Sequence, residues 1–234
     1  MLDHSEEITF DYYSDTNSVS EFHSENQDSL FASVSKLVFA VADGVGGYLG
    51  AKEASQIAVE IIKDSPTSLD SEESMDSCLG EIAKRVKERS RELHYEGMGT
   101  TLALAKVIPG KRTVVTANVG DSPIFLIKSG ENDAILLYKD DSLRFEDPDN
   151  MWSIIQYLGF DGRLSIHTKS TRYENGDILL LCSDGVSDNV LGRGNNVSRL
   201  ADLVKENKSA KALVQIAMGT GLKSDDMTAI LVFL

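Results

Sequence analysis

Two copies of the tripeptide Asp-Gly-Val carry the clearest chemistry in the sequence, because each follows an apolar stretch that ends abruptly. Asp43 ends the stretch 37–42, and Asp184 closely follows the stretch 178–182. A strand of this composition delivers one carboxylate to the edge of a sheet, and the glycine behind it lets the backbone turn sharply and a ligand approach closely. Two such strand ends predict two carboxylates in one place.

Further aspartates stand at predicted strand ends or turns, namely Asp121, Asp188 and Asp225, and Asp28 lies about one hairpin away from Asp43. Carboxylates gathered in one place repel each other and do not stay ionised without compensation. Oxygen ligands without histidine or cysteine indicate a hard divalent ion, Mg²⁺ or Mn²⁺. Two such ions polarise a phosphate and lower the pKa of a bridging water. The predicted chemistry is hydrolysis of a phosphate ester by this water, without a protein nucleophile.

The bulk composition narrows the function classes. Hydrophobic residues make up 41% of the 234 residues and charged residues 26%, which is typical of a soluble globular protein. The net charge of −14 repels phosphate backbones and anionic membranes, so we expect no nucleic-acid or membrane partner and disfavour a metal-dependent nuclease. Cys78 and Cys182 form no C-x-x-C pattern, and we find neither a signal peptide nor a membrane span. A cytoplasmic location is expected.

Hydrophobic periodicity predicts the elements that must position these aspartates. We expect strands at 8–13, 37–42, 101–107, 113–119, 124–128, 134–138, 164–171, 177–182 and 227–234. Helices are expected at 51–63, 75–93, 197–206 and 209–218, with a short helix at 151–158. The turn signal at 120–123 places Asp121 at a hairpin tip. This order favours an α+β fold, a central antiparallel β-sandwich flanked by pairs of α-helices in four layers (α-β-β-α), with residues 1–234 as a single domain.

Seven motifs in this order resemble a known family, the metal-dependent PPM phosphoprotein phosphatases, also called protein phosphatase type 2C, in their short bacterial-like form. The motifs are HSENQD (23–28), VADGVGG (41–47), GMGTT (97–101), NVGDS (118–122), YLG (157–159), LCSDGVSDN (181–189) and SDDMT (224–228). The resemblance implies a phosphatase-like domain that hydrolyses phosphoserine and phosphothreonine in protein substrates, with Mg²⁺ or Mn²⁺ as cofactor. It also implies two ions with a possible third.

The resemblance assigns the ligands of the two main ions. Asp43 would bridge them, and the carbonyl oxygen of Gly44 would bind one of them. Asp184 and Asp225 would complete the protein ligands of the other ion.

Further roles follow from the same resemblance. Asp121 and Asp188 match positions that hold a third, looser ion in bacterial-type members. Asp28 matches the catalytic acid that orients the attacking water, which makes the water a better nucleophile.

His23 and Gln27 depart from the family pattern, which usually reads Arg-x-x-Asn-Glu-Asp where this chain has HSENQD. The family arginine holds the substrate phosphate, and a guanidinium grips phosphate better than an imidazole does. His23 is the predicted phosphate-binding residue here and would act only when protonated. This departure motivates an alternative function, a degenerate phosphatase that binds a phosphoprotein as a regulatory module. In either case we expect a monomer.

Overall fold

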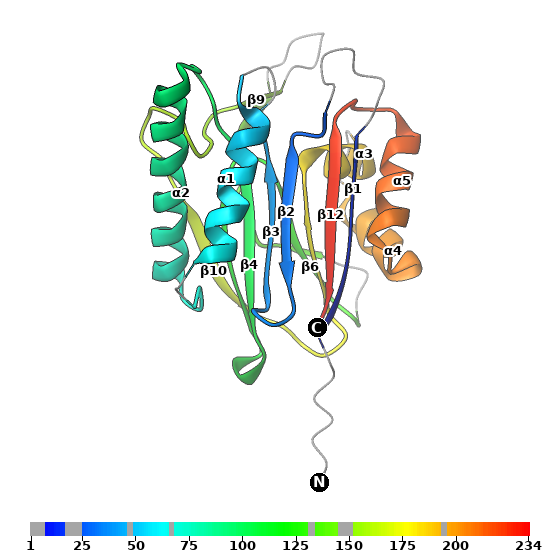
Figure 1. Ribbon diagram of the computed structural model, residues 1–234. Helices are drawn as coiled ribbons and strands as arrows, with labels where there is room; N and C mark the ends of the chain where they lie inside the picture. The colour runs from blue at the N-terminus through cyan, green and yellow to red at the C-terminus, as the bar shows by residue number, and fades with distance from the viewer. Residues whose placement is uncertain are drawn as a thin grey trace.

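Two five-stranded antiparallel sheets form the centre of the fold (Figure 1). The computed structural model describes residues 8–16, 25–45, 49–65, 68–130, 134–144, 152–192 and 196–234. The first sheet has the order β10-β5-β4-β3-β2, with bounds β2 (Asp28–Ser33), β3 (Val38–Asp43), β4 (Leu102–Ile108), β5 (Thr113–Val119) and β10 (His167–Arg172). The second sheet has the order β1-β12-β11-β6-β7, with bounds β1 (Thr9–Thr16), β6 (Ile124–Ile127), β7 (Ala134–Leu136), β11 (Ile178–Cys182) and β12 (Asp226–Phe233). A separate pair consists of β8 (Ser142–Arg144) and β9 (Trp152–Ile154).

The helices cover the two outer faces of this sandwich (Figure 1). The first sheet carries α1 (Ala51–Asp64) and α2 (Glu72–Leu93), and the second carries α3 (Asp184–Leu191), α4 (Val197–Asn207) and α5 (Ala210–Thr220). Their apolar residues recur at helical spacing, which gives each helix one face to bury. Among the described residues, no helix is long and apolar enough to cross a membrane.

Three apolar layers hold the four structural layers together. In β3, Val38, Ala40 and Ala42 face α1 and α2, whereas Phe39 and Val41 face the second sheet. This alternation follows from the two-residue period of a strand. Because both faces are buried, the strand shows an unbroken apolar sequence. The predicted α-β-β-α sandwich is confirmed, with three helices rather than a pair on the second sheet in the described part of the chain.

Two local predictions are wrong. The segment 151–158, predicted as a helix, contains β9, and Leu158 forms a bridge with Thr100. The backbone N–H and C=O of Leu158 are both bonded to Thr100, at 2.8 and 3.0 Å, so they are unavailable to a helix. The turn at 120–123 is not a hairpin tip, because β5 and β6 lie in different sheets. This turn instead carries the chain from the first sheet to the second.

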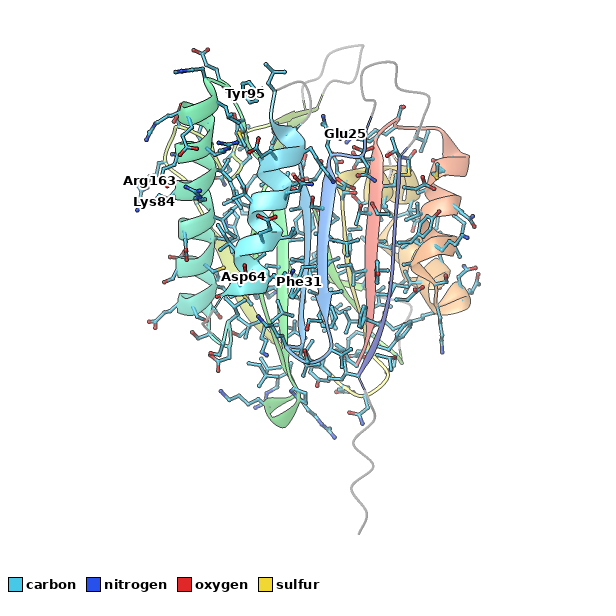
Figure 2. The ribbon with its side chains drawn as sticks, viewed as in Figure 1. Glu25, Phe31, Asp64, Lys84, Tyr95 and Arg163 are labelled. Carbon is cyan, nitrogen blue, oxygen red and sulfur yellow. The ribbon has the colours of Figure 1, made fainter. Side chains whose placement is uncertain are left out.

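Strands from both sheets begin or end at one end of the sandwich, shown at the top of Figure 1. Here β2 starts and β3 ends in the first sheet, while β12 starts and β11 ends in the second. Figure 2 shows Glu25 at this end, with Phe31 farther down β2. We call it the acidic end, defined by Asp28, Asp43, Asp184 and Asp225.

Candidate metal centre

The β2–β3 hairpin positions the first two carboxylates. Asp28 and Asp43 are direct partners across the antiparallel pair, as their spacing in the sequence suggested. The backbone of Asp43 is fixed by Thr101, whose N–H donates to the Asp43 carbonyl at 2.8 Å and whose Oγ1 accepts from the Asp43 N–H at 3.2 Å. The Asp43 side chain therefore projects from a rigid strand end.

Gly44 is required by a close approach of backbone. A Cβ added here would lie 2.4 Å from the carbonyl oxygen of Ala51, the first residue of α1. Real Cβ atoms do not come this close, so only glycine lets the start of α1 pack against the end of β3. The Asp-Gly sequence thus brings the helix next to the carboxylate.

The second Asp-Gly pair does the same in the other sheet. A Cβ added at Gly185 would lie 2.1 Å from the carbonyl oxygen of Asp226 and 3.2 Å from Cβ of Asp225. The first turn of α3 and the start of β12 therefore meet backbone to backbone. This contact places Asp184, the first residue of α3, beside Asp225.

Hydrogen bonds join the sheets at the acidic end. Ser183 Oγ donates to Asp28 Oδ2 at 2.8 Å, and the backbone N–H of Gln27 donates to Asp226 Oδ2 at 2.7 Å. Ser183 Oγ also accepts from the backbone N–H of Thr228 at 3.0 Å. Ser183 and Asp226 lie within the sequence motifs but were not singled out as site residues. Their role depends on the contact between sheets, which no local pattern reveals.

The carboxylates at this end act on each other electrostatically. Burial raises the pKa of Asp43 well above its usual value, and the charges of Asp28, Asp184, Asp225 and Asp121 raise it further, in that order. Burial likewise raises the pKa of Asp225, with Asp184 as the next cause. These effects show that five carboxylates from both sheets lie within electrostatic reach of one another.

Asp28 is the most deeply buried of these acids, with 4% of the residue exposed. Burial raises its pKa to about 7, aided by the charges of Asp226 and Asp225 and opposed by hydrogen bonds from Thr228 and Ser183. Its Oδ1 atom is buried without a hydrogen-bond partner, and so is Oδ1 of Asp184. Buried oxygens left in this way are costly unless a cation or water binds them.

Asp121 lies in the connection between the sheets. Gly120 has a positive φ of 97°, and its N–H donates to Oδ2 of the buried Asp141 at 3.1 Å. Asp141 Oδ1 in turn lies 3.0 Å from Nε2 of His167 on β10. Burial raises the pKa of Asp121 well above its usual value, and the charge of Asp184 raises it further. The turn thus holds Asp121 near the Asp184 carboxylate.

Lys223 was missed as a site residue from the sequence. Its Nζ contacts Oδ2 of Asp184 and lies 3.1 Å from Oδ2 of Asp225 and 3.6 Å from Oδ2 of Asp188. Burial opposes the charge of Lys223, but these three aspartates outweigh it and raise the pKa of Lys223 well above its usual value. Asp188 thereby joins the cluster, one helical turn after Asp184.

The donor set fits hard divalent ions in chemistry, although the side chains do not form a closed coordination sphere. Among the described residues, no three acidic, histidine or cysteine side chains are grouped around one point as ligands of a single ion. Mg²⁺ and Mn²⁺ accept carboxylate and carbonyl oxygens, and Mg²⁺ usually keeps several waters, so a partial set of protein ligands suffices for each ion. The unpartnered oxygens of Asp28 and Asp184 agree with this. His23, the predicted phosphate-binding residue, lies outside the described residues.

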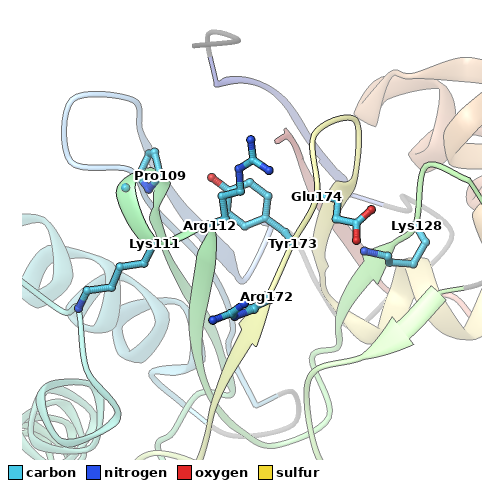
Figure 3. Close-up of a pocket in the computed structure, with 8 residues that line it drawn as sticks. Pro109, Lys111, Arg112, Lys128, Arg172, Tyr173 and Glu174 are labelled. Carbon is cyan, nitrogen blue, oxygen red and sulfur yellow. The ribbon is translucent and has the colours of Figure 1, made fainter. Parts of the chain in front are cut away.

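A pocket of about 460 Å³ opens at the opposite end of the sandwich (Figure 3). It lies beyond the far end of β4, whose seven residues span about 23 Å. Its lining is mostly basic and consists of Pro109, Gly110, Lys111, Arg112, Lys128, Arg172, Tyr173 and Glu174. Because it contains none of the clustered aspartates, this pocket is not the candidate metal centre.

Comparisons with known proteins agree with the motifs. The family model described as stage II sporulation protein E (SpoIIE), a domain of the protein phosphatase 2C type, matches residues 33–233. The serine/threonine phosphatase stp of Listeria innocua is 30% identical over 188 residues, covering 72% of this chain and 74% of the relative. The chain belongs to the PPM phosphatase family. The predicted family membership is confirmed.

Two further similarities extend over more of the PPM chain. The serine/threonine phosphatase stp of Listeria welshimeri is 28% identical over 231 residues and covers 89% of each chain. A structure of the PstP catalytic domain in complex with two manganese ions has a TM-score of 0.77, covers 97% of each chain and is 23% identical. At this identity the structural likeness establishes the fold alone. It confirms the four-layer α+β architecture.

Proposed function

We propose that this PPM-family chain is a Mg²⁺- or Mn²⁺-dependent phosphatase that hydrolyses phosphoserine and phosphothreonine in proteins. One observation carries the proposal: carboxylates from both sheets converge at the acidic end, where burial and then their mutual charges raise the pKa values of Asp43, Asp121 and Asp225. A group of acids that resist joint ionisation requires cations. The relatives named serine/threonine phosphatases support the activity, and the PstP structure supports two manganese ions as cofactor.

The chain offers distinct ligands for two ions. Asp43 would bridge them, with the Gly44 carbonyl as a ligand of one ion and Asp184 and Asp225 as ligands of the other. From the sequence, Asp121 and Asp188 are the predicted ligands of a possible third ion. When bound, the ions supply charge that polarises the phosphate and lowers the pKa of the attacking water.

Asp28 accepts a proton from the attacking water. Without bound ions, burial raises the pKa of Asp28 to about 7, and the positive charge of the ions would lower it, which leaves an ionised carboxylate able to accept a proton at neutral pH. Ser183 Oγ donates to Oδ2 of Asp28, which leaves Oδ1 as the atom with no protein partner. We therefore assign proton acceptance to Oδ1 and the positioning of the carboxylate to Ser183.

The substrate is a phosphorylated protein, and the cations are what allow an anionic phosphate to approach an acidic end. His23 stays the predicted phosphate contact of the chain. We further propose that residues 1–234 form one phosphatase-like domain, which acts as a cytoplasmic monomer without nucleic-acid or membrane partners. The net charge of −14 supports the last point.

Release of inorganic phosphate from a phosphothreonine peptide tests the proposal. Purified protein should be active with Mn²⁺, inactive after EDTA treatment and active again when Mn²⁺ is restored. The Glu174→Gln variant, altered in the pocket at the opposite end, should keep its activity and serves as the control. Hydrolysis that is indifferent to EDTA would contradict the proposal. Binding of Mn²⁺ and phosphopeptide without turnover would favour the degenerate, regulatory alternative.

A further inference from the structure

Lys223 is held in place by its backbone as well as by its side chain. The side-chain amide of Asn189 on α3, 1% exposed, bonds both backbone polar groups of Lys223. Asn189 Oδ1 accepts from the Lys223 N–H at 2.9 Å, and Asn189 Nδ2 donates to the Lys223 carbonyl at 2.9 Å. Lys223 is therefore attached directly to the helix that carries Asp184 and Asp188.

The same amide fixes the neighbouring chain. Asn189 Oδ1 also accepts from the Leu222 N–H at 3.0 Å and from Thr220 Oγ1 at 2.7 Å, while Nδ2 donates to the Gly185 carbonyl at 2.7 Å. One buried side chain thus organises the segment between α5 and β12. This segment is mostly exposed, but Asn189 fixes its backbone, so Lys223 is not free.

The ammonium group has the contacts that a cation would have at this position. Its Nζ lies within ion-pair distance of Asp184, Asp188 and Asp225, in each case at Oδ2. The side chain of Lys223 is 28% exposed, and that of Asp184 is 15% exposed. In such surroundings an ion pair is screened less than at the surface. The ammonium also has a high effective concentration, because it is tethered beside its partners.

We propose that the Lys223 ammonium permanently takes the place of one divalent cation, so that this chain binds two ions where its carboxylates would otherwise hold three. The inference rests on the proposed function, because it concerns ions at the same acidic end. Lys223 supplies beside Asp188 the positive charge that the third ion would supply. Oδ1 of Asp184, which has no hydrogen-bond partner, stays open to a main ion. Asp43 contacts no lysine, arginine or histidine among the ion pairs of the described residues, so that side of the cluster is left to the ions.

Counting bound Mn²⁺ by equilibrium dialysis tests this inference without reference to activity. Wild-type protein should bind two ions. Lys223→Met, which keeps the length of the side chain and removes its charge, should bind three. Lys223→Arg keeps the charge and should bind two. In the double variant Lys223→Met with Asp188→Asn the count should return to two, because the third ion loses a ligand.

Several results would overturn the inference. A wild-type count of three is one, and an unchanged count with unchanged affinities in Lys223→Met is another. If Lys223→Met is not folded, as judged by the absence of cooperative unfolding, the Mn²⁺ count of the single variant Asp188→Asn decides. Binding of one ion fewer than wild type by this variant refutes the inference. Wild-type protein that binds no Mn²⁺ refutes the proposed function as well. Two bound ions without phosphopeptide hydrolysis refute only the function.

Discussion

The two Asp-Gly strand ends are built alike but differ in charge. Asp43 is the last residue of β3, and Asp184 begins α3 two residues after β11 ends. At both, the following glycine lies so close to another backbone that a Cβ would clash, at 2.4 Å for Gly44 and 2.1 Å for Gly185. Asp184 contacts the ammonium of Lys223, whereas the charges that act most strongly on Asp43 are all negative. The Asp184 half carries part of its compensating positive charge on Lys223, whereas the Asp43 half depends entirely on ions from solution.

The largest expected effect concerns activity at the Asp43 half. Asp43→Asn should lower kcat/KM for a phosphothreonine peptide by more than about 100-fold, because loss of a direct ligand should exceed the 10–100-fold typical of outer-shell partners. Asp188→Asn should cost less than about 10-fold, since Lys223 already neutralises that side. Steady-state kinetics in excess Mn²⁺ measure both. Equal losses of kcat/KM in the two variants would contradict the proposed difference between the two halves.

The Asp28→Asn variant concerns the contact between the Asp43 half and the Asp184 half of the acidic end, where Ser183 donates to Asp28. Asp28→Asn should lower kcat/KM by about 10–100-fold, because the amide still accepts from Ser183 but cannot take a proton. It should also change the pH dependence of stability, measured by urea unfolding in EDTA. The pKa of Asp28 is raised to about 7 by folding, so the native chain binds the extra proton between about pH 4 and pH 7.

This linkage has a definite sign. The proton that native Asp28 holds more tightly than the unfolded chain stabilises the wild-type protein. This stabilisation is fully present below the pKa of Asp28 in the unfolded chain and is lost as the pH rises through about 7. Asparagine does not ionise, so the variant should gain stability relative to wild type from pH 5 to pH 8. A stability difference that stays constant over this range would contradict the assigned burial of the charge.

Stabilisation by Mn²⁺ is the next effect in size. A ligand that binds only the native state at 100 times its Kd adds about 2.7 kcal/mol to the free energy of unfolding. For a chain of this length, that raises Tm by about 5–10 °C. Asp43→Asn should lose most of this rise and Asp188→Asn little of it. Differential scanning calorimetry with Mn²⁺ and with EDTA compares them, and a rise that survives in Asp43→Asn would count against ions at that half.

The glycines should give the smallest effects. Gly44→Ala and Gly185→Ala should each lower the free energy of unfolding by about 1–3 kcal/mol, the usual cost of overpacking. Gly80→Ala, in an exposed position on α2 with open space around the added Cβ, is the matched control and should stabilise by about 0.5–1 kcal/mol. Chemical denaturation measures all three. A neutral Gly185→Ala would mean that the first turn of α3 and the start of β12 are not in close contact there.

Local pattern was sufficient for the strand ends and the hairpin at the acidic end. The apolar run before Asp43 marked a strand, and the spacing to Asp28 suggested the hairpin that makes them partners. Helical periodicity gave α1, α4 and α5 nearly as they are, but α2 begins at Glu72, three residues early, because Ser71 and Ser74 form a capping box. These features depend on neighbours in sequence.

The missed features depend on neighbours in space. The turn at Asp121 has the residues of a hairpin, yet β5 and β6 join different sheets. Ser183 and Lys223 have ordinary local surroundings in the sequence. Ser183 gains a role only when the sheets pack together, and Lys223 only when Asn189 binds its backbone. Tertiary packing decides all three.

Anomalous scattering from crystals soaked in Mn²⁺ tests the central claim most directly. We predict two peaks at the acidic end, with at least one within about 2.5 Å of an Asp43 carboxylate oxygen. Lys223 should remain against Asp184. Peaks that avoid Asp43, or a peak in the position of the Lys223 ammonium, would contradict this account.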